Sequence, residues 1–261
     1  MSNFLLRQMT LDDLERSRGW AAQEGWNPGI YDAASFFATD PKGFFVGEMD
    51  GEPISCISAV AYDATFGFVG FYIVRPEFRG RGFGWQTWQH GMNYLGDRVV
   101  GLDGVLAQQE NYRKSGFALA YRNIRYQGTF PDISGNASLQ SASEVPFKAL
   151  VAFDQQFFPV ERRAFLNAWI HQTGSISLVK QEAQQIVGYG VIRPAVTGWK
   201  IGPLFANNAA IAEELLHGLV THTNGDMCVL DVPEPNPAAI ALAEKHQMSP
   251  VFETARMYTH T

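Results

Sequence analysis

Residues 43–74, which read GFFVGEMDGEPISCISAVAYDATFGFVGFYIV, contain three strand-like runs rich in hydrophobic residues. This pattern predicts three strands. The dipeptide Asp50-Gly51 between apolar runs is typical of a hairpin turn, and a second turn is expected near residues 63–65. Upstream we expect a strand over residues 4–8 and a helix over residues 11–23. Thr10 is the expected N-cap of this helix, which breaks near Gly25 and restarts at Asp32.

A helical pattern follows residue 84, because Trp85, Trp88, Met92 and Leu95 are spaced for one helix face. Gly96 is the expected C-cap. Two further strands are expected over residues 101–106 and 118–127. Residues 129–146 are rich in Ser, Pro, Gly and Asn, and we interpret them as an interdomain connection.

The second half repeats the order of elements found in the first. The expected elements are a helix over residues 157–171, strands over 176–180, 186–193 and 199–205, a helix over 209–222, a strand over 227–232, a helix over 237–245 and a strand over 252–258. This repetition predicts a duplicated α/β unit whose two copies need not share a function.

The composition is that of an ordinary globular protein. The 261 residues are 46% hydrophobic, which suffices for a packed core, and the net charge is −6. This acidity disfavours a general nucleic-acid or anionic-membrane binder and is compatible with a cationic small substrate. No segment approaches 18 uncharged apolar residues, so we expect a cytoplasmic protein without a membrane partner.

Cys56 and Cys228 are flanked by apolar or small residues, and we expect free thiols in the core. The six histidines are scattered and show no familiar ligand spacing, so the sequence predicts no metal site.

The stretch VRPEFRGRGFG, residues 74–84, carries the strongest chemical signal. Gly80, Gly82 and Gly84 let the backbone approach a ligand, and the helix that follows presents unpaired amides suited to a phosphate or pyrophosphate. Neither a P-loop nor a dinucleotide fingerprint matches the spacing. An ordinary glycine-rich turn and an arginine-glycine RNA-binding tract are the alternatives.

This stretch, with FVGFYIV before it and NYRKSGF about thirty residues later, resembles the acetyl-CoA-binding core of the GCN5-related N-acetyltransferase (GNAT) superfamily. The resemblance covers residues 4–127. In the second half RRAFLNAWI, GYGVIRP, KIGPLFA, LDVPEPN and ARMY resemble the C-terminal domain of the bacterial YitH-like group.

The resemblance implies an α/β fold of two tandem GNAT-like domains, each with a mixed, mostly antiparallel central sheet flanked by helices. The expected divisions are a domain over residues 1–128 that binds acetyl-CoA, a linker over 129–146 and a degenerate domain over 147–261. The second copy reads FANNAAIAEE where the glycines would be, and Ala243 stands where the family tyrosine would be. We therefore expect one cofactor site per chain, with the second copy shaping an acceptor cleft or a dimer interface, in a monomer or homodimer.

The resemblance also implies which residues contact acetyl-CoA. Loop amides would hold the pyrophosphate, and the strand before the loop, which is bulged in the family, would pair with the pantetheine arm. The residues implied are Phe71, Tyr72, Ile73, Val74, Arg79, Gly80, Arg81, Gly82, Phe83, Gly84, Trp85 and Asn111.

Tyr112 matches the superfamily tyrosine that often protonates the departing thiolate. The alternative is an aromatic ring packed under the cofactor with no role in proton transfer. The match is incomplete, because Val105 and Gln108 stand where the family often places Asn and Ala.

The segment after the first helix falls where the superfamily places its acceptor-binding loop. Trp26, Asn27 and Tyr31 are the candidate substrate contacts, and Glu24 and Asp32 are the candidate general bases. The alternative is that Asp32 caps a helix and Glu24 is solvated. A third carboxylate, Asp63, is interpreted as a turn residue.

These observations predict an N-acetyltransferase that moves the acetyl group of acetyl-CoA to a primary amine of a small molecule, directly within a ternary complex. The chain shows no motif for an acyl-enzyme nucleophile. The alternative is a non-catalytic acyl-CoA-binding or sensing protein with a regulatory tandem domain. Nucleic-acid binding fits the acidic composition least well.

Overall fold

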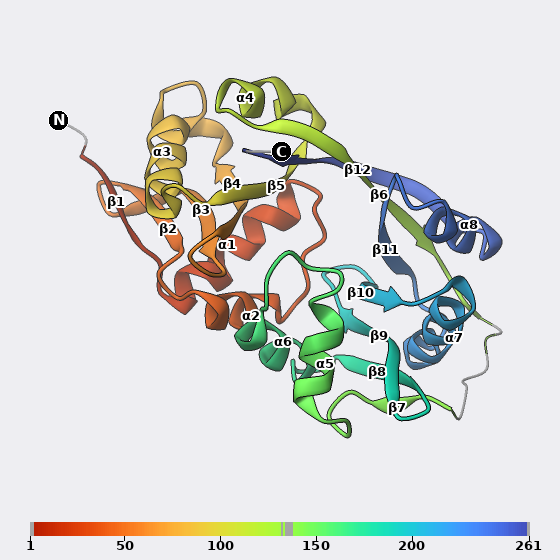
Figure 1. The fold of residues 1–261 in the computed structure, drawn as a ribbon. Helices are drawn as coiled ribbons and strands as arrows, with labels where there is room; N and C mark the ends of the chain where they lie inside the picture. The colour runs from red at the N-terminus through yellow and green to blue at the C-terminus, as the bar shows by residue number, and fades with distance from the viewer. Residues whose placement is uncertain (1–2, 132, 134–137, 260–261) are drawn as a thin grey trace. The chain divides into compact units, whose positions relative to one another are not determined.

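The computed structural model describes residues 3–131, 133 and 138–259, so part of the expected linker, residues 132 and 134–137, lies outside it. The chain forms two compact units (Figure 1). Among the described residues, the first unit contains residues 3–28, 33–120 and 255–259, and the second contains the remainder.

The first unit is a mixed sheet with helices on its faces. Its strands follow the order β1, β2, β3, β4, β5, with β1 to β4 antiparallel and β4 parallel to β5. Its elements are β1 (Phe4–Gln8), α1 (Leu11–Gln23), α2 (Asp32–Thr39), β2 (Phe44–Met49), β3 (Glu52–Ala61), β4 (Phe66–Val74), α3 (Phe83–Leu95), β5 (Val99–Val105) and α4 (Gln109–Lys114).

Local sequence accounts for these elements. Thr10 and Asp13 form a capping box at the start of α1, as the N-cap prediction requires. Asp50 and Gly51 both have positive φ, which gives the tight turn between β2 and β3. Alternate residues of β3 face opposite sides of the sheet. Cys56 and Val60 enter one core with α1, whereas Ile57 and Ala59 enter a second core with α3.

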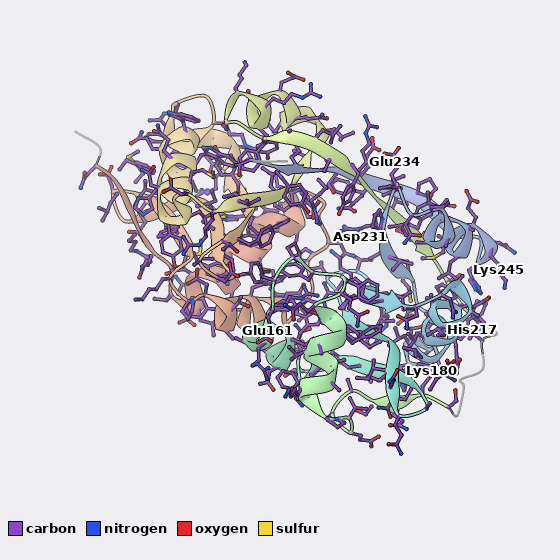
Figure 2. The ribbon with its side chains drawn as sticks, in the orientation of Figure 1. Glu161, Lys180, His217, Asp231, Glu234 and Lys245 are labelled. Atoms are coloured by element: carbon purple, nitrogen blue, oxygen red, sulfur yellow. The ribbon has the colours of Figure 1, made fainter. Side chains whose placement is uncertain are left out.

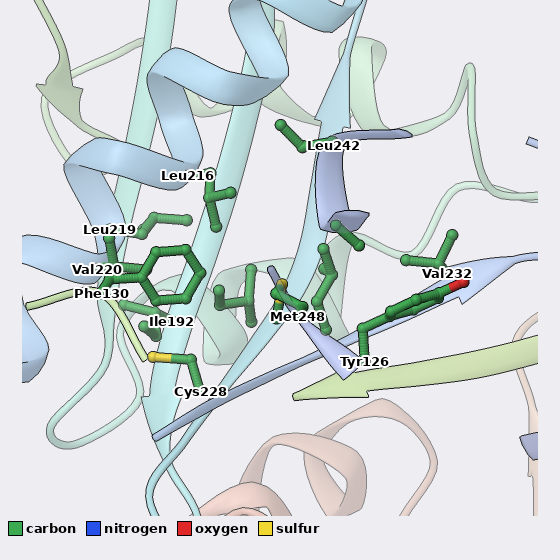
Figure 3. Close-up of a cluster of buried hydrophobic side chains, with 13 residues drawn as sticks. Tyr126, Phe130, Ile192, Leu216, Leu219, Val220, Cys228, Val232, Leu242 and Met248 are labelled. Carbon is green, nitrogen blue, oxygen red and sulfur yellow. The ribbon is translucent and has the colours of Figure 1, made fainter. Parts of the chain in front are cut away.

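The second unit repeats this plan. Its strand order is β12, β6, β11, β10, β9, β8, β7, with β10 parallel to β11 and α7 packed on β8, β9 and β10. Figure 3 shows the core beneath α7, built around Leu216, Leu219 and Phe130. Its elements are β6 (Ala118–Gly128), β7 (Gln140–Ser141), α5 (Phe147–Asp154), α6 (Arg163–Ile170), β8 (Ile176–Glu182), β9 (Gln185–Pro194), β10 (Trp199–Ala206), α7 (Ala209–Val220), β11 (Cys228–Pro233), α8 (Pro237–Lys245) and β12 (Ser249–Tyr258).

The last described residues, 255–259, belong to the first unit. The expected domains over residues 1–128 and 147–261 did not include this exchange. Ala255 and Met257 of β12 are fully buried in the core of the first unit beneath α3. The Val100 amide donates to Thr259 Oγ1 at 3.0 Å, so this segment lies beside β5. The last residues thus cover an edge of the first sheet that would otherwise expose unpaired backbone groups.

Two expectations about helices were wrong in detail. The helix expected over residues 157–171 covers only α6, Arg163–Ile170, and is separated by a break from α5, an unexpected helix that ends at Asp154. Pro159 lies in the break, and a proline disfavours helical backbone at the residue before it. In α3, Trp88 is buried but Trp85 is 55% exposed. Trp85 belongs to the first turn, ahead of the buried stripe of Trp88, Gly91 and Leu95.

Both cysteines are free and buried, as predicted. Burial raises the pKa of the Cys56 thiol far above its ordinary value and that of Cys228 to about 11, so both thiols stay protonated. Among the described residues, no helix combines the length and the apolar character that crossing a bilayer requires.

Candidate active site

Strand β4 is bulged at Phe71 and Tyr72. The pairing with β3 runs from Ser58–Gly70 to Cys56–Ile73, so two residues of β4 lie opposite one residue of β3. Phe71 has a positive φ of 52°, which is uncommon for a residue with a side chain. Val69 and Ile73 would share a face of a regular strand, yet they enter different cores. The bulge therefore reverses the facing of the residues that follow it, and it confirms the bulged strand that the resemblance implied.

The bulge marks the point where β4 and β5 separate. Their parallel pairing runs from Phe66–Val99 to Val69–Leu102 and ends there, although both strands continue. The backbone of β4 from residue 70 to residue 74 therefore lies beyond this pairing. Amides and carbonyls on that edge are placed to hydrogen bond an extended ligand.

The loop after β4 leaves the start of α3 open. Gly80 and Gly82 have φ of 74° and 83°, and a Cβ at either position would meet no atom within 4 Å. Gly82 is the N-cap residue of α3, and no side chain caps the helix. A Cβ at Gly84 would lie 2.7 Å from Tyr72 Oη and 3.0 Å from a Val74 methyl carbon. The glycines thus provide the left-handed backbone and the close approach that a phosphate cradle needs.

A buried hydroxyl pair fixes the first turn of α3 on the sheet. Thr87 Oγ1 donates to the Phe83 carbonyl at 2.9 Å, and Ser55 Oγ of β3 lies 2.8 Å from Thr87 Oγ1. Ser55 and Thr87 are completely buried. The ring of Phe83 also packs against Phe4, with centroids 4.9 Å apart. The open amides of this helix are therefore held on a rigid support.

The three arginines of the loop have different surroundings. Arg75 pairs with Glu52 and Glu77. Arg79 pairs with Glu24, and its Nε donates to the Val74 carbonyl at 2.8 Å.

The guanidinium of Arg81 lies over the rings of Phe78 and Phe83, 5.7 and 5.1 Å from their centroids. Within the described part of the chain, no carboxylate pairs with this guanidinium. Arg81 is therefore the loop arginine available to an anionic ligand.

The rings of Tyr72 in β4 and Tyr112 in α4 both pack against the buried Trp88. Tyr72 lies 5.4 Å and Tyr112 lies 5.6 Å from Trp88 between ring centroids. Burial raises the pKa of Tyr112, while burial together with Tyr112 raises the pKa of Tyr72 to about 12. Both phenols therefore remain protonated at neutral pH, which is the form that a proton donor requires. Asn111, next to Tyr112, is exposed and its amide donates to Gln108 at 2.6 Å.

The predicted acceptor loop begins in the first unit. Glu24 is the C-cap residue of α1 and is held by Arg79. Trp26 packs against the core formed with α1, and its amide donates to the Ala21 carbonyl at 3.0 Å. Asn27 has a positive φ of 48°. The carboxylate of Glu24 is thus engaged in an ion pair with Arg79 of the loop, and its role as a general base stays a prediction.

The remaining acceptor candidates belong to the second unit. Tyr31 is 42% exposed there. Asp32 accepts from Arg193 at 2.7 and 3.2 Å, and from the Gly29 amide at 3.2 Å. Burial alone would raise the pKa of Asp32, but the charge of Arg193 and its hydrogen bond outweigh burial and lower it. A carboxylate stabilised in this way is a weak base, and Asp32 instead fixes its loop to β9.

The second unit has the same connection of a bulged strand through a helix to a parallel strand, but side chains within its described residues bind the bulge and the helix start. β10 is bulged between Ile201 and Leu204, as β4 is. The carbonyl of Gly202 within that bulge accepts from Trp169 Nε1 at 3.0 Å and from Arg193 Nη1 at 3.3 Å. At the start of α7, Asn208 Oδ1 accepts from the Ile211 amide at 3.0 Å. In the second unit, side chains of the protein therefore bind the bulge carbonyl and the helix-start amide that a ligand would need.

Comparison with known proteins agrees with both halves. Residues 8–117 match the family described as "Acetyltransferase (GNAT) family", and residues 150–261 match "Acetyltransferase (GNAT) domain". A protein named holothin acyltransferase from Pseudoalteromonas sp. (strain SANK 73390) is 30% identical, over 95% of this chain and 85% of that protein. The chain belongs to the GNAT acetyltransferase family. It is an acyltransferase with two GNAT domains.

Other GNAT relatives support the same fold. YitH of Bacillus subtilis (strain 168), described as an uncharacterized N-acetyltransferase, is 23% identical over 81% of this chain and 76% of its own length. A putative acetyltransferase from Pyrococcus horikoshii aligns with 98% of this chain and 88% of its own, with a TM-score of 0.82 and 21% identity. A tandem GNAT protein from the clavulanic acid biosynthesis pathway gives a TM-score of 0.69, with 13% identity over 98% of each chain.

GNAT proteins generally use acetyl-CoA, and the first unit has features that fit it. Gly84 lies where a Cβ would meet Tyr72 and Val74, and the amides at the start of α3 have no side-chain cap. The structure thus brings the predicted strand, glycine and tyrosine residues into one unit. It also gathers Glu213, His217 and His246, a group absent from the sequence predictions.

Proposed function

We propose that this GNAT protein transfers the acetyl group of acetyl-CoA to a primary amine of a small molecule, with one donor site per chain in the first unit. The observation that carries this proposal is the uncapped start of α3 directly after a bulged strand that has separated from its neighbour. The second unit carries the same topology with its helix start capped by Asn208.

The residues that would hold the donor follow from the open backbone groups. The amides of residues 80–85 would bind the pyrophosphate with Arg81, and the backbone of residues 71–74 would pair with the pantetheine arm. Asn111 and the exposed face of Trp85 remain proposed contacts at the edge of this site. When bound, acetyl-CoA supplies an acetyl group activated as a thioester.

Tyr112 is the proposed proton donor to the departing thiolate. Its raised pKa keeps the hydroxyl protonated over the physiological range, and its ring is fixed between Trp88 and Gly104. A Cβ at Gly104 would lie 2.3 Å from a Tyr112 ring carbon, so glycine is needed there. Tyr72 has similar surroundings and serves as the matched control below.

Trp26, Asn27 and Tyr31 stay the proposed contacts to the acceptor. The relative named holothin acyltransferase makes holothin the first acceptor to test, beside a panel of primary amines. Direct transfer requires donor and acceptor to be bound together, because the sequence offers no motif for an acyl-enzyme nucleophile.

Calorimetric titration with acetyl-CoA and an assay of thiol release with the amine panel test this function. We expect one donor molecule per chain and turnover with at least one amine. Initial rates at several concentrations of both substrates should give intersecting reciprocal plots. Parallel plots would indicate an acyl-enzyme, and absence of acetyl-CoA binding would overturn the proposed donor site.

A further inference from the structure

Three possible metal ligands meet in the second unit, where each is partly exposed. Glu213 and His217 lie one turn apart on α7, and His246 follows the last residue of α8. One ligand atom of each residue lies within 4.8 Å of the other two. The Glu-x-x-x-His spacing is a local signal for two of these ligands, whereas His246 is distant in the chain.

The distances between these atoms suit a metal ion at their centre. His217 Nε2 and His246 Nε2 are 3.4 Å apart, and Glu213 Oε1 lies 3.1 Å from His246 Nε2 and 3.8 Å from His217 Nε2. Ligands about 2.0–2.1 Å from a tetrahedral zinc ion are separated by about 3.3 Å. The three separations are therefore close to those along one face of such a tetrahedron.

Hydrogen bonds within the cluster satisfy its three atoms less completely than a metal ion would. His246 Nε2 lies within hydrogen-bonding distance of both Glu213 and His217. A proton on His246 Nε2 can be donated to Glu213 or to His217, but not fully to both. If His217 Nε2 also carried a proton, that proton would be directed at the protonated His246 Nε2. A metal ion accepts a lone pair from each of the three atoms at the same time.

The side chains of Glu213, His217 and His246 are 24%, 32% and 14% exposed, so an ion can enter from solvent.

Lys245 is the group that competes with a metal ion. Its Nζ lies 2.7 and 2.8 Å from the two Glu213 oxygens, and its side chain is 62% exposed. Figure 2 shows Lys245 and His217 on the neighbouring helices α8 and α7. An exposed lysine can leave the carboxylate at small cost, since surface ion pairs contribute little to stability.

We propose that Glu213, His217 and His246 form a zinc site that joins α7 to the end of α8, with water as the fourth ligand. This site is independent of acetyl transfer in the first unit. Two imidazoles and one carboxylate form a set of ligands that is typical of zinc sites.

The first test uses the full-length chain after treatment with a chelator. Calorimetric titration with Zn²⁺ should give about one ion per chain, and Co²⁺ should produce the intense visible absorption of tetrahedral coordination. Failure of Zn²⁺ to bind, or a Co²⁺ spectrum typical of the hydrated ion, would overturn the proposal. This spectrum is read on the unaltered protein and does not depend on a variant.

Variants assign the binding to these residues. His217→Ala and His246→Ala should each abolish the Co²⁺ absorption and measurable Zn²⁺ binding. His171→Ala is the matched control, because His171 is an exposed histidine of the same unit that bonds the Asn167 carbonyl. Lys245→Gln should tighten Zn²⁺ binding by removing the competing cation. Unchanged Zn²⁺ binding in both His217→Ala and His246→Ala would place the ion elsewhere and refute the site.

Discussion

Helices α3 and α7 occupy the same position in their two units, after a bulged strand and before a parallel one, but their first turns differ. Gly82 begins α3 with a left-handed backbone and no side-chain cap, whereas Asn208 begins α7 and binds the Ile211 amide. Positive φ at the start of α3 requires glycine, and the side chain of Asn208 satisfies an amide that a ligand would need.

The same contrast extends to the residues around each helix. In the first unit the ring of Tyr112 packs against Trp88 and is only partly buried. In the second unit Ala243 stands at the corresponding sequence position and is completely buried in the core. The two units thus share the sheet and its topology, and they differ in the side chains around the start of the helix.

Replacing Tyr112 by phenylalanine tests the contrast with Ala243 and has the largest expected effect. Loss of the proton donor should lower kcat by about 10²- to 10⁴-fold. Tyr72→Phe should change kcat much less, although its ring also contacts Trp88. Thiol release under saturating substrates measures both variants. Full turnover in Tyr112→Phe would reduce this tyrosine to an aromatic support.

The pH dependence of kcat also tests the proposed role of Tyr112 as a proton donor. Because burial raises the pKa of Tyr112 above the ordinary 10.0, the protonated acid should persist until the pH exceeds that value. An alkaline loss of kcat due to this group is therefore expected above pH 10.

The glycine at the start of α3 can be tested against a glycine of the same geometry elsewhere. Gly82→Val should weaken acetyl-CoA binding by about 10- to 100-fold, or about 1–3 kcal/mol, because relief of the strain at positive φ would displace the amides that bind the pyrophosphate. Gly51 has a similar φ of 85° and similarly open surroundings in the hairpin after β2. Gly51→Val should therefore destabilise the fold comparably and bind acetyl-CoA normally. Equal loss of binding in both variants would indicate a general folding defect.

A substitution at the start of α7 in the second unit should affect stability but not acetyl-CoA binding. Asn208→Ala should lower the free energy of unfolding by about 1 kcal/mol, because the Ile211 amide loses its partner. Acetyl-CoA binding should not change. Denaturant unfolding and calorimetry measure the two effects, and a large loss of donor binding would contradict a single site in the first unit.

The smallest expected effect concerns the ion pair between Glu24 and Arg79. Both side chains are partly exposed, so Glu24→Gln should raise the KM for acetyl-CoA by no more than about fivefold, which corresponds to about 1 kcal/mol. The acid side of the kcat profile should stay in place. A collapse of kcat that depends on pH would instead identify Glu24 as the general base.

Much of the fold was predictable because its signals are local. The hairpin at Asp50-Gly51, the N-cap at Thr10 and the helix after Gly82 each depend on residues close in sequence. The glycine loop of the candidate site was found for the same reason. The break before α6 was missed, although Pro159 provides a local signal for it.

The sequence by itself determined the repeated α/β units, the open glycine loop in one copy and its loss in the other. These properties depend on short patterns of φ, capping and periodicity, which need no distant partner. Only the tertiary structure decided which charged side chains form ion pairs. Glu24 meets Arg79 and Asp32 meets Arg193.

It also returned the end of β12 to the first unit and brought His246 to Glu213 and His217. Such contacts join residues far apart in the chain. Their selection depends on the packing of whole elements, which no local pattern encodes.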